Sequence, residues 1–176
     1  GGAFAFMTDE LATYAKAVVA PEYRDGPTAY EFAGRSLGDG VVGFGLHLHG
    51  RGEWKLTGYG GGDSLLFWVT RDRAYFGDGR PRVQVYRSLD EVNMILLAST
   101  AIDGSIDDFR TYRLEYDPGT GILRIAVDGS IVLKVFGLWS EPDFDFAALR
   151  ARDLAQFFDL RIMPLGETSE FDEASP

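Results

Sequence analysis

The sequence has 176 residues, 22 glycines, no cysteine and a formal net charge of −10 at pH 7. This length suits a single domain with its own core, and so much glycine without a long apolar helical segment favours many short strands joined by tight turns. The acidic charge disfavours nucleic acid and polyanionic glycans as partners, since binding them depends on a basic surface. Neutral or cationic ligands fit better.

Two further absences exclude classes of chemistry and of membrane attachment. Without cysteine the chain forms no disulfide bond, thiolate metal site or cysteine nucleophile. No apolar run approaches the roughly 20 residues of a membrane-spanning helix, so we expect no membrane insertion. The N-terminal residues show no basic segment followed by an apolar one, as an export signal would. Exported proteins lose this segment on processing, so its absence leaves the location open.

The first third of the chain mixes two patterns. Residues 14–19 alternate as a strand does, although residues 9–19 could also form a helix capped at Thr8 or Asp9. We favour the strand. A turn-rich connection over residues 21–27 leads to another predicted strand that begins at residues 28–33.

The next predicted strand, residues 40–50, has two unlike faces. Phe44, Leu46 and Leu48 form a core face, and the opposite face carries Gly43, Gly45, His47 and His49. The glycines leave room for a ligand to lie against the sheet. The two histidines could share a metal ion if a third ligand faced them, but hydrogen-bonded or solvated histidines are the commoner case, so we predict no metal site.

Residues 51–63 form a glycine-rich loop that carries Trp54 and Tyr59. No helix follows, as one would after a phosphate-binding loop, so we expect a loop with exposed aromatic anchors. Strands are predicted for residues 64–71 and 82–87. Residues 92–98 are almost continuously apolar, which predicts a strand buried on both faces at the centre of a sandwich.

The clearest segment is a predicted three-stranded meander over residues 108–135. Residues 112–116 and 123–127 alternate as half-buried strands do. A turn with one proline and two glycines joins them, and Asp128-Gly129 is the typical sequence of a type I′ hairpin. The pattern predicts an all-β protein.

Residues 108–116, D-F-R-T-Y-R-L-E-Y, followed by I-L-R-I-A-V-D-G at residues 122–129, resemble the signature hairpin of the concanavalin A-like lectin and glucanase superfold. This hairpin occurs in laminin-G-like jelly rolls, in related carbohydrate-binding modules and in retaining β-glucanases. Residues 157–162 also resemble the closing strand of laminin-G-like domains. The resemblance implies an all-β, two-sheet antiparallel jelly-roll sandwich in which the first and last strands usually pair. It also implies an extracellular, periplasmic or cell-surface location.

We expect this jelly-roll domain to span residues 1–165, with an acidic C-terminal tail over residues 166–176. At most one or two short helices are expected, and the pattern of residues 147–155 is the clearest helical one.

Retaining β-glucanases of this superfold carry an E-x-D-x-E strand whose carboxylates share the catalytic roles. The strands predicted before residue 108 contain no such triplet. Glu141, Asp143 and Asp145 have the right spacing, but they follow the meander and enclose a proline, which favours a solvated acidic loop. We therefore predict no catalytic residue and no enzyme activity. No cofactor is expected, although a structural calcium ion stays open, with Asp103, Asp107 and Asp108 as loop candidates.

Aromatic residues offer the best functional case, because the CH face of a neutral sugar stacks on an indole or phenol ring while polar neighbours bind its hydroxyls. The candidate ligand-binding residues are His47, His49, Trp54, Tyr59, Trp68, Arg71, Gln84, Tyr86 and Arg87. Core packing is the competing interpretation, and for Trp68 it is the stronger one.

These patterns predict a non-catalytic carbohydrate-binding or cell-surface interaction module of the laminin-G-like, concanavalin A-like type. Its expected partner is a neutral glycan or another surface protein. Two alternatives stay open: a glycoside hydrolase of the β-glucanase type, and a structural protein–protein interaction domain without sugar affinity.

Overall fold

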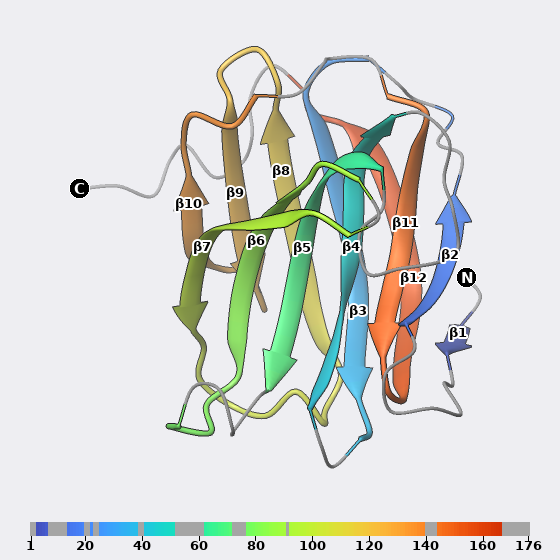
Figure 1. Cartoon of the computed structure of the whole chain (residues 1–176), viewed down its shortest axis with the longest axis vertical. Coiled ribbons are helices and arrows are strands. Elements are labelled where there is room, and N and C mark those ends of the chain that lie inside the picture. Colours follow the sequence, from blue (N-terminus) through green and yellow to red (C-terminus); the bar gives the residue numbers. More distant parts are fainter. Residues whose placement is uncertain are drawn as a thin grey trace.

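The computed structural model describes residues 3–6, 14–19, 22, 25–38, 41–51, 62–71, 77–90, 92–139 and 144–166. These residues form twelve strands and no helix, arranged as two antiparallel sheets that pack face to face (Figure 1). No helix that could cross a membrane occurs among them. The predicted all-β, two-sheet jelly-roll sandwich is confirmed.

Each sheet has six strands. Sheet A contains, in spatial order, β1 (Ala3–Phe6), β12 (Ala155–Pro164), β3 (Thr28–Ser36), β8 (Arg110–Asp117), β9 (Ile122–Val127) and β10 (Ser130–Val135). Sheet B contains β2 (Tyr14–Val19), β11 (Phe146–Arg152), β4 (Val42–Arg51), β5 (Asp63–Arg71), β6 (Arg82–Ser88) and β7 (Met94–Ala101). The edge strands are therefore β1 and β10 in sheet A and β2 and β7 in sheet B.

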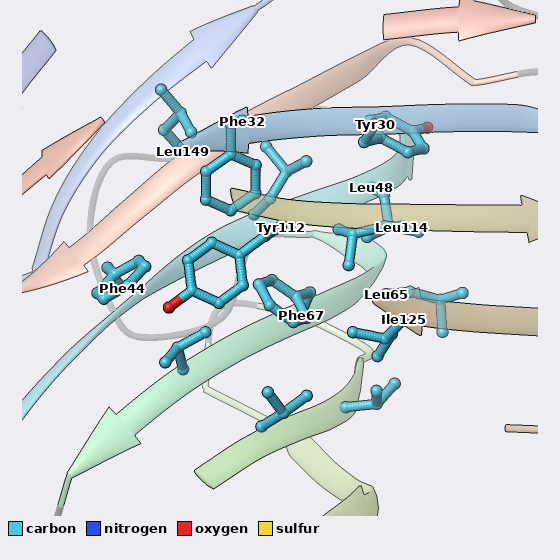
Figure 2. Packing of buried hydrophobic residues seen from close by; sticks show 14 of the residues in the cluster. Tyr30, Phe32, Phe44, Leu48, Leu65, Phe67, Tyr112, Leu114, Ile125 and Leu149 are labelled. Atoms are coloured by element: carbon cyan, nitrogen blue, oxygen red, sulfur yellow. The ribbon is translucent and has the colours of Figure 1, made fainter. Parts of the chain in front are cut away.

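Aromatic side chains from both sheets fill the space between them (Figure 2). Phe32 and Tyr112 of sheet A stack with ring centres 5.4 Å apart, and Phe44 of sheet B meets Tyr112 edge-on at 5.5 Å. Each fully buried phenylalanine contributes roughly 1.5–3 kcal/mol. The predicted core face of Phe44, Leu46 and Leu48 is confirmed, since all three are fully buried.

Two tyrosine hydroxyls are also buried in this core. Burial raises the pKa of Tyr30 and of Tyr112 far above the usual value of a phenol, because the charged phenolate would lose its hydration. Both side chains therefore stay protonated and behave as core aromatics.

The predicted meander is confirmed as β8, β9 and β10. Asp128 and Gly129 have φ angles of 50° and 79°, as a type I′ turn requires at both central positions. The Asp128 carboxylate fixes the turn further, because it accepts hydrogen bonds from the Thr111 N–H at 3.0 Å and from Arg110 Nε at 2.7 Å.

Two predicted elements are wrong. Residues 147–155 form no helix, because β11 obtains its backbone hydrogen bonds from β2 and β4, and this pairing overrides the helical preference of its alanines. Residues 92–98 do not form a central strand: β7 is an edge strand, and Ile95 and Leu97 expose 51% and 41% of their surface. A continuous apolar run alone does not show whether both faces are covered.

The first and last strands of the chain do pair, β1 with β12, although the first strand is Ala3–Phe6 and went unpredicted. Residues 14–19 form the predicted strand, β2, but it pairs with β11. Residues 167–176 of the expected acidic tail lie outside the described residues.

Candidate ligand-binding face

The outer face of sheet B, which points away from sheet A, brings together polar and aromatic side chains from neighbouring strands. Register places Arg150 (β11), Gly45 (β4), Trp68 (β5), Gln84 (β6) and Ser99 (β7) in one row across the sheet. The adjacent row is formed by Ala148, His47, Leu66, Tyr86 and Leu96. These positions alternate with the core residues of the same strands and therefore face outward.

The indole of Trp68 fills the space that the glycines of β4 leave. A Cβ atom added at Gly43 would lie 2.3 Å from the Trp68 ring, so only glycine allows the indole to lie flat against the strand. The Arg150 guanidinium carbon lies 5.3 Å from the centre of the same ring, within cation–π range. The room that the sequence predicted for a ligand is thus occupied by the protein's own tryptophan.

His47 connects Arg150 to β5. Its Nδ1 lies 3.0 Å from the Ser64 hydroxyl oxygen, and its Nε2 lies 3.5 Å from Arg150 Nη1. A guanidinium group can only donate, so Nε2 is the acceptor and the proton of a neutral imidazole lies on Nδ1, which donates to Ser64. All three side chains are buried, and the cluster forms a fixed polar floor under the outer face.

The β6–β7 hairpin covers part of this floor. In Figure 1 the lime-green hairpin crosses in front of β5 and β4, and Arg150 Nη1 donates to Met94 Sδ at 3.5 Å. The Asp90 carboxylate holds the tip of the hairpin by accepting from the N–H groups of Val92 and Asn93, both at 2.8 Å, and from the Asn93 side chain. These hydrogen bonds lower the pKa of Asp90 below its usual value of 3.8, and the bond from the Asn93 side chain has the largest effect.

Beyond the hairpin, the accessible part of the outer face lies on β7 and at Tyr86 of β6. The Tyr86 hydroxyl donates to Gln84 Oε1 at 3.0 Å, which fixes the orientation of both side chains. Ser99 and Leu96 are exposed beside Tyr86, whereas Trp68 and Gln84 keep only 9% and 3% of their surface accessible. This region offers a partly exposed aromatic ring and a hydroxyl to a ligand, and the Gln84 amide lies buried beneath them.

His49 does not lie on this face. An irregularity in the β4–β5 register between Leu48 and Arg51, with a φ angle of 49° at His49, turns its side chain into the sandwich. There the imidazole stacks on Phe144 at 4.3 Å and meets Tyr116 edge-on at 4.7 Å. The expectation that His47 and His49 share a face is wrong. The two imidazoles therefore do not form the metal-binding pair that the sequence analysis considered.

Arg71 and Arg87 also lie off the outer face of sheet B. Each stands an even number of residues from the core residues of its strand, so its side chain points away from that face. Arg71 binds the Asp107 carboxylate at 2.9 Å and the Gly38 carbonyl at 2.8 Å. Arg87 pairs with Asp63 at 2.5 Å and donates to the Trp139 carbonyl at 2.6 Å. Both guanidinium groups therefore tie loops to strand ends.

The remaining predicted residues divide between described and undescribed parts of the chain. Trp54, Tyr59, Glu141 and Asp143 lie outside the described residues, whereas Asp145 is exposed. Asp103 pairs with Arg80 at 2.7 Å, and Asp107 with Arg71. Within the described ranges, no group of three or more histidine and carboxylate side chains is placed to hold a metal ion.

Ion pairs occupy the centre of the outer face of sheet A, and the exposed ring of Phe158 lies nearer its β1 edge. Arg113 binds Glu115 at 3.0 Å and Glu31 at 3.2 Å across β3 and β8. Burial works against the charge of Arg113, but these carboxylates outweigh it and raise its pKa. The centre of this face is therefore charged, unlike the corresponding rows of sheet B.

The sequence interpretation missed Arg150, Ser64, Ser99 and Met94. Arg150 carried a usable signal, because it alternates with two core residues, Leu149 and Ala151, once residues 146–152 are taken as a strand. Met94 carried none, since its contact with Arg150 depends on how the hairpin curls.

No protein-family model matches the sequence, and no curated protein does either. Solved structures do match. The carbohydrate-binding module CBM66 from Bacillus subtilis is 11% identical over 84% of this chain and 81% of its own, with a TM-score of 0.62. The carbohydrate recognition domain of Emp46p, in its metal-free form, is 14% identical over 90% and 91%, with a TM-score of 0.61.

A protein of unknown function with a galectin-like fold, also from Bacillus subtilis, is 12% identical over 90% of this chain and 80% of its own, with a TM-score of 0.64. Identities this low establish the fold alone. The specific resemblance to laminin-G-like domains stays a prediction. The chain has the lectin-like β-sandwich fold that galectin-like and other carbohydrate-recognition domains share.

Proposed function

We propose that this domain is a non-catalytic carbohydrate-binding module that takes a neutral glycan on the outer face of sheet B, over β6 and β7. The observation that carries the proposal is the partly exposed Tyr86, fixed by its hydrogen bond to the buried Gln84, beside the exposed Ser99. The shared fold with carbohydrate-recognition domains supports it.

The chemistry of this region suits a sugar ring. A pyranose places its CH face on an aromatic ring such as Tyr86, while the Ser99 hydroxyl reaches its hydroxyl groups. Because the Tyr86–Gln84 hydrogen bond and the buried floor hold these groups in place, binding costs little side-chain entropy.

Charge supports a neutral ligand. The two rows of the outer face contain no carboxylate, and their single cation, Arg150, is buried under Met94. The chain as a whole carries −10, which repels polyanionic glycans. An extracellular, periplasmic or cell-surface location, where neutral glycans are displayed, belongs to the same proposal.

Calorimetry against a panel of neutral oligosaccharides tests the proposal. Tyr86→Ala is expected to weaken binding about fivefold or more, since an aromatic contact of this kind supplies about 1 kcal/mol. Phe109→Ala is the matched control, because Phe109 is an exposed aromatic away from sheet B. Absence of binding across the panel, or equal losses in both variants, would contradict the proposal.

The glycoside hydrolase alternative makes a different prediction. A hydrolase that used Asp145 would release reducing ends from β-glucans, and Asp145→Asn would abolish the release. We expect no release from the unaltered chain, measured with a reducing-sugar assay at saturating glucan.

A further inference from the structure

One edge of the sandwich exposes an apolar surface. We call Ile95, Leu97, Phe136 and Trp139 the edge patch; their exposed fractions are 51%, 41%, 67% and 68%. They lie on β7 and just after β10, the free edges of sheets B and A, which appear on the same side of the molecule in Figure 1.

The edge patch is hollowed. Leu97, Phe136 and Trp139 border a cleft of about 390 Å³ whose base includes Leu65 and Val135. A volume in this range receives a drug-sized molecule or a large side chain. The patch therefore contains both protruding aromatic rings and a recess that could accept one.

Charge is almost absent here. β7 carries no charged residue over its eight positions. Among the described residues, Arg87 is the one charged residue that lines the cleft, and Asp63 neutralises it at 2.5 Å. Natural sheet edges are usually protected by charges, proline, a bulge or a cover. β10 carries the exposed Lys134, but β7 has only the irregularity at Leu97, so its neutral, apolar edge in a chain of net charge −10 favours a covered surface.

The exposed area is comparable with the largest apolar patch of a typical monomer, about 300–600 Å², which is often functional. Phe136 and Trp139 together expose roughly 300 Å² at the fractions above, since an aromatic side chain offers about 150–250 Å². Ile95 and Leu97 extend this toward the roughly 800 Å² per partner of a standard protein interface.

We infer that the edge patch binds the edge patch of a second copy of this chain, in a two-fold symmetric dimer. A two-fold interface requires a self-complementary surface, and this patch offers both ring and recess. Its neutrality lets two copies meet without opposing like charges, despite the net charge of each. Leu97 interrupts the β6–β7 register, so side-chain packing forms the interface in place of a continuous sheet across the dimer.

Sedimentation equilibrium of the full chain tests the inference. A reversible monomer–dimer equilibrium is expected in the micromolar range or below. Trp139→Lys and Phe136→Lys should each weaken dimerisation at least about tenfold, equivalent to about 1.4 kcal/mol, because central aromatic anchors dominate such interfaces.

Val18→Lys is the matched control. Val18 is 46% exposed on β2, the opposite edge of the same sheet, and the substitution changes the net charge by the same amount. Its dimerisation should equal that of the unaltered chain. Circular dichroism and thermal melting establish that each variant is folded, which the exposure of these side chains predicts.

Salt and sugar provide two further readouts. Dimerisation should strengthen with sodium chloride, since salt screens the repulsion between two acidic copies. Glycan binding by Trp139→Lys should be unchanged, because the edge patch is separate from Tyr86 and Gln84. A monomer at millimolar concentration, open-ended association, or equal weakening by Val18→Lys would overturn the inference.

Discussion

The two faces of β5 carry side chains with different roles. Phe67 points into the core among Phe32 and Tyr112, whereas its neighbour Trp68 points outward onto Gly43 and Arg150. The inner face packs apolar side chains, while the outer face packs aromatic, amide and guanidinium groups, of which Trp68 keeps 9% of its surface accessible. The comparison indicates that inner residues set stability and that outer residues set the shape of a recognition surface.

The largest effect is expected from substitutions on β5 itself. Phe67→Ala should lower the free energy of unfolding by about 4 kcal/mol, since it leaves a cavity between two packed sheets. Trp68→Ala should cost less, about 3 kcal/mol, because the indole keeps 9% of its surface accessible and lies outside the central core. Urea denaturation measures both, and equal losses would break the comparison.

Arg150→Ala is expected to cost about 2 kcal/mol, as it removes a charged donor from buried His47 and the cation above Trp68. Arg161→Ala is the control, because the Arg161–Asp159 pair lies at the surface and contributes less than about 1 kcal/mol. The same denaturation assay measures both losses. An unchanged free energy of unfolding in Arg150→Ala would mean that the polar floor gives no stability.

Gly43→Ala should cost about 1–2 kcal/mol, because the added methyl group would displace the Trp68 indole. Gly166→Ala adds a methyl group where nothing lies within 4 Å, and no loss is expected. Tryptophan fluorescence should shift in the first variant alone. An unchanged spectrum would show that the indole is not held against β4.

The smallest effect concerns pH and the tip of the β6–β7 hairpin. The pKa of Asp90 is lowered in the folded protein, so its stabilising effect is present above the ordinary value of 3.8 and is lost as the pH falls through the lower folded value. Amide exchange of Val92 and Asn93 should accelerate there relative to core amides. A uniform acceleration would instead indicate global opening.

Alternation predicted much of the fold because most strands here have one core face. Residues 28–33, 64–71 and 82–87 and the meander were predicted by this pattern, and two turn signals fixed the order of the meander. The site was harder to predict. One register irregularity near His49 turned a predicted ligand-binding side chain into the core, and no local sequence pattern predicts such a change.

Two segments failed for the opposite reason, since local preference pointed away from the tertiary arrangement. The alanines of β11 favour a helix, which concealed Arg150 from the sequence interpretation. The apolar run of β7 fits a buried strand as well as an exposed edge, and sequence alone does not reveal what lies beside it. The surfaces most relevant to binding were therefore the least predictable.

The buried phenols of Tyr30 and Tyr112 give the core a sensitivity to alkali. Because burial raises the pKa of both in the folded state, their stabilising effect is complete below about pH 10, the unfolded value, and declines as the pH rises beyond it. Solvent must enter between the sheets before either group can ionise. The rate at which their ultraviolet absorption changes in alkali therefore reports how fast the two sheets separate.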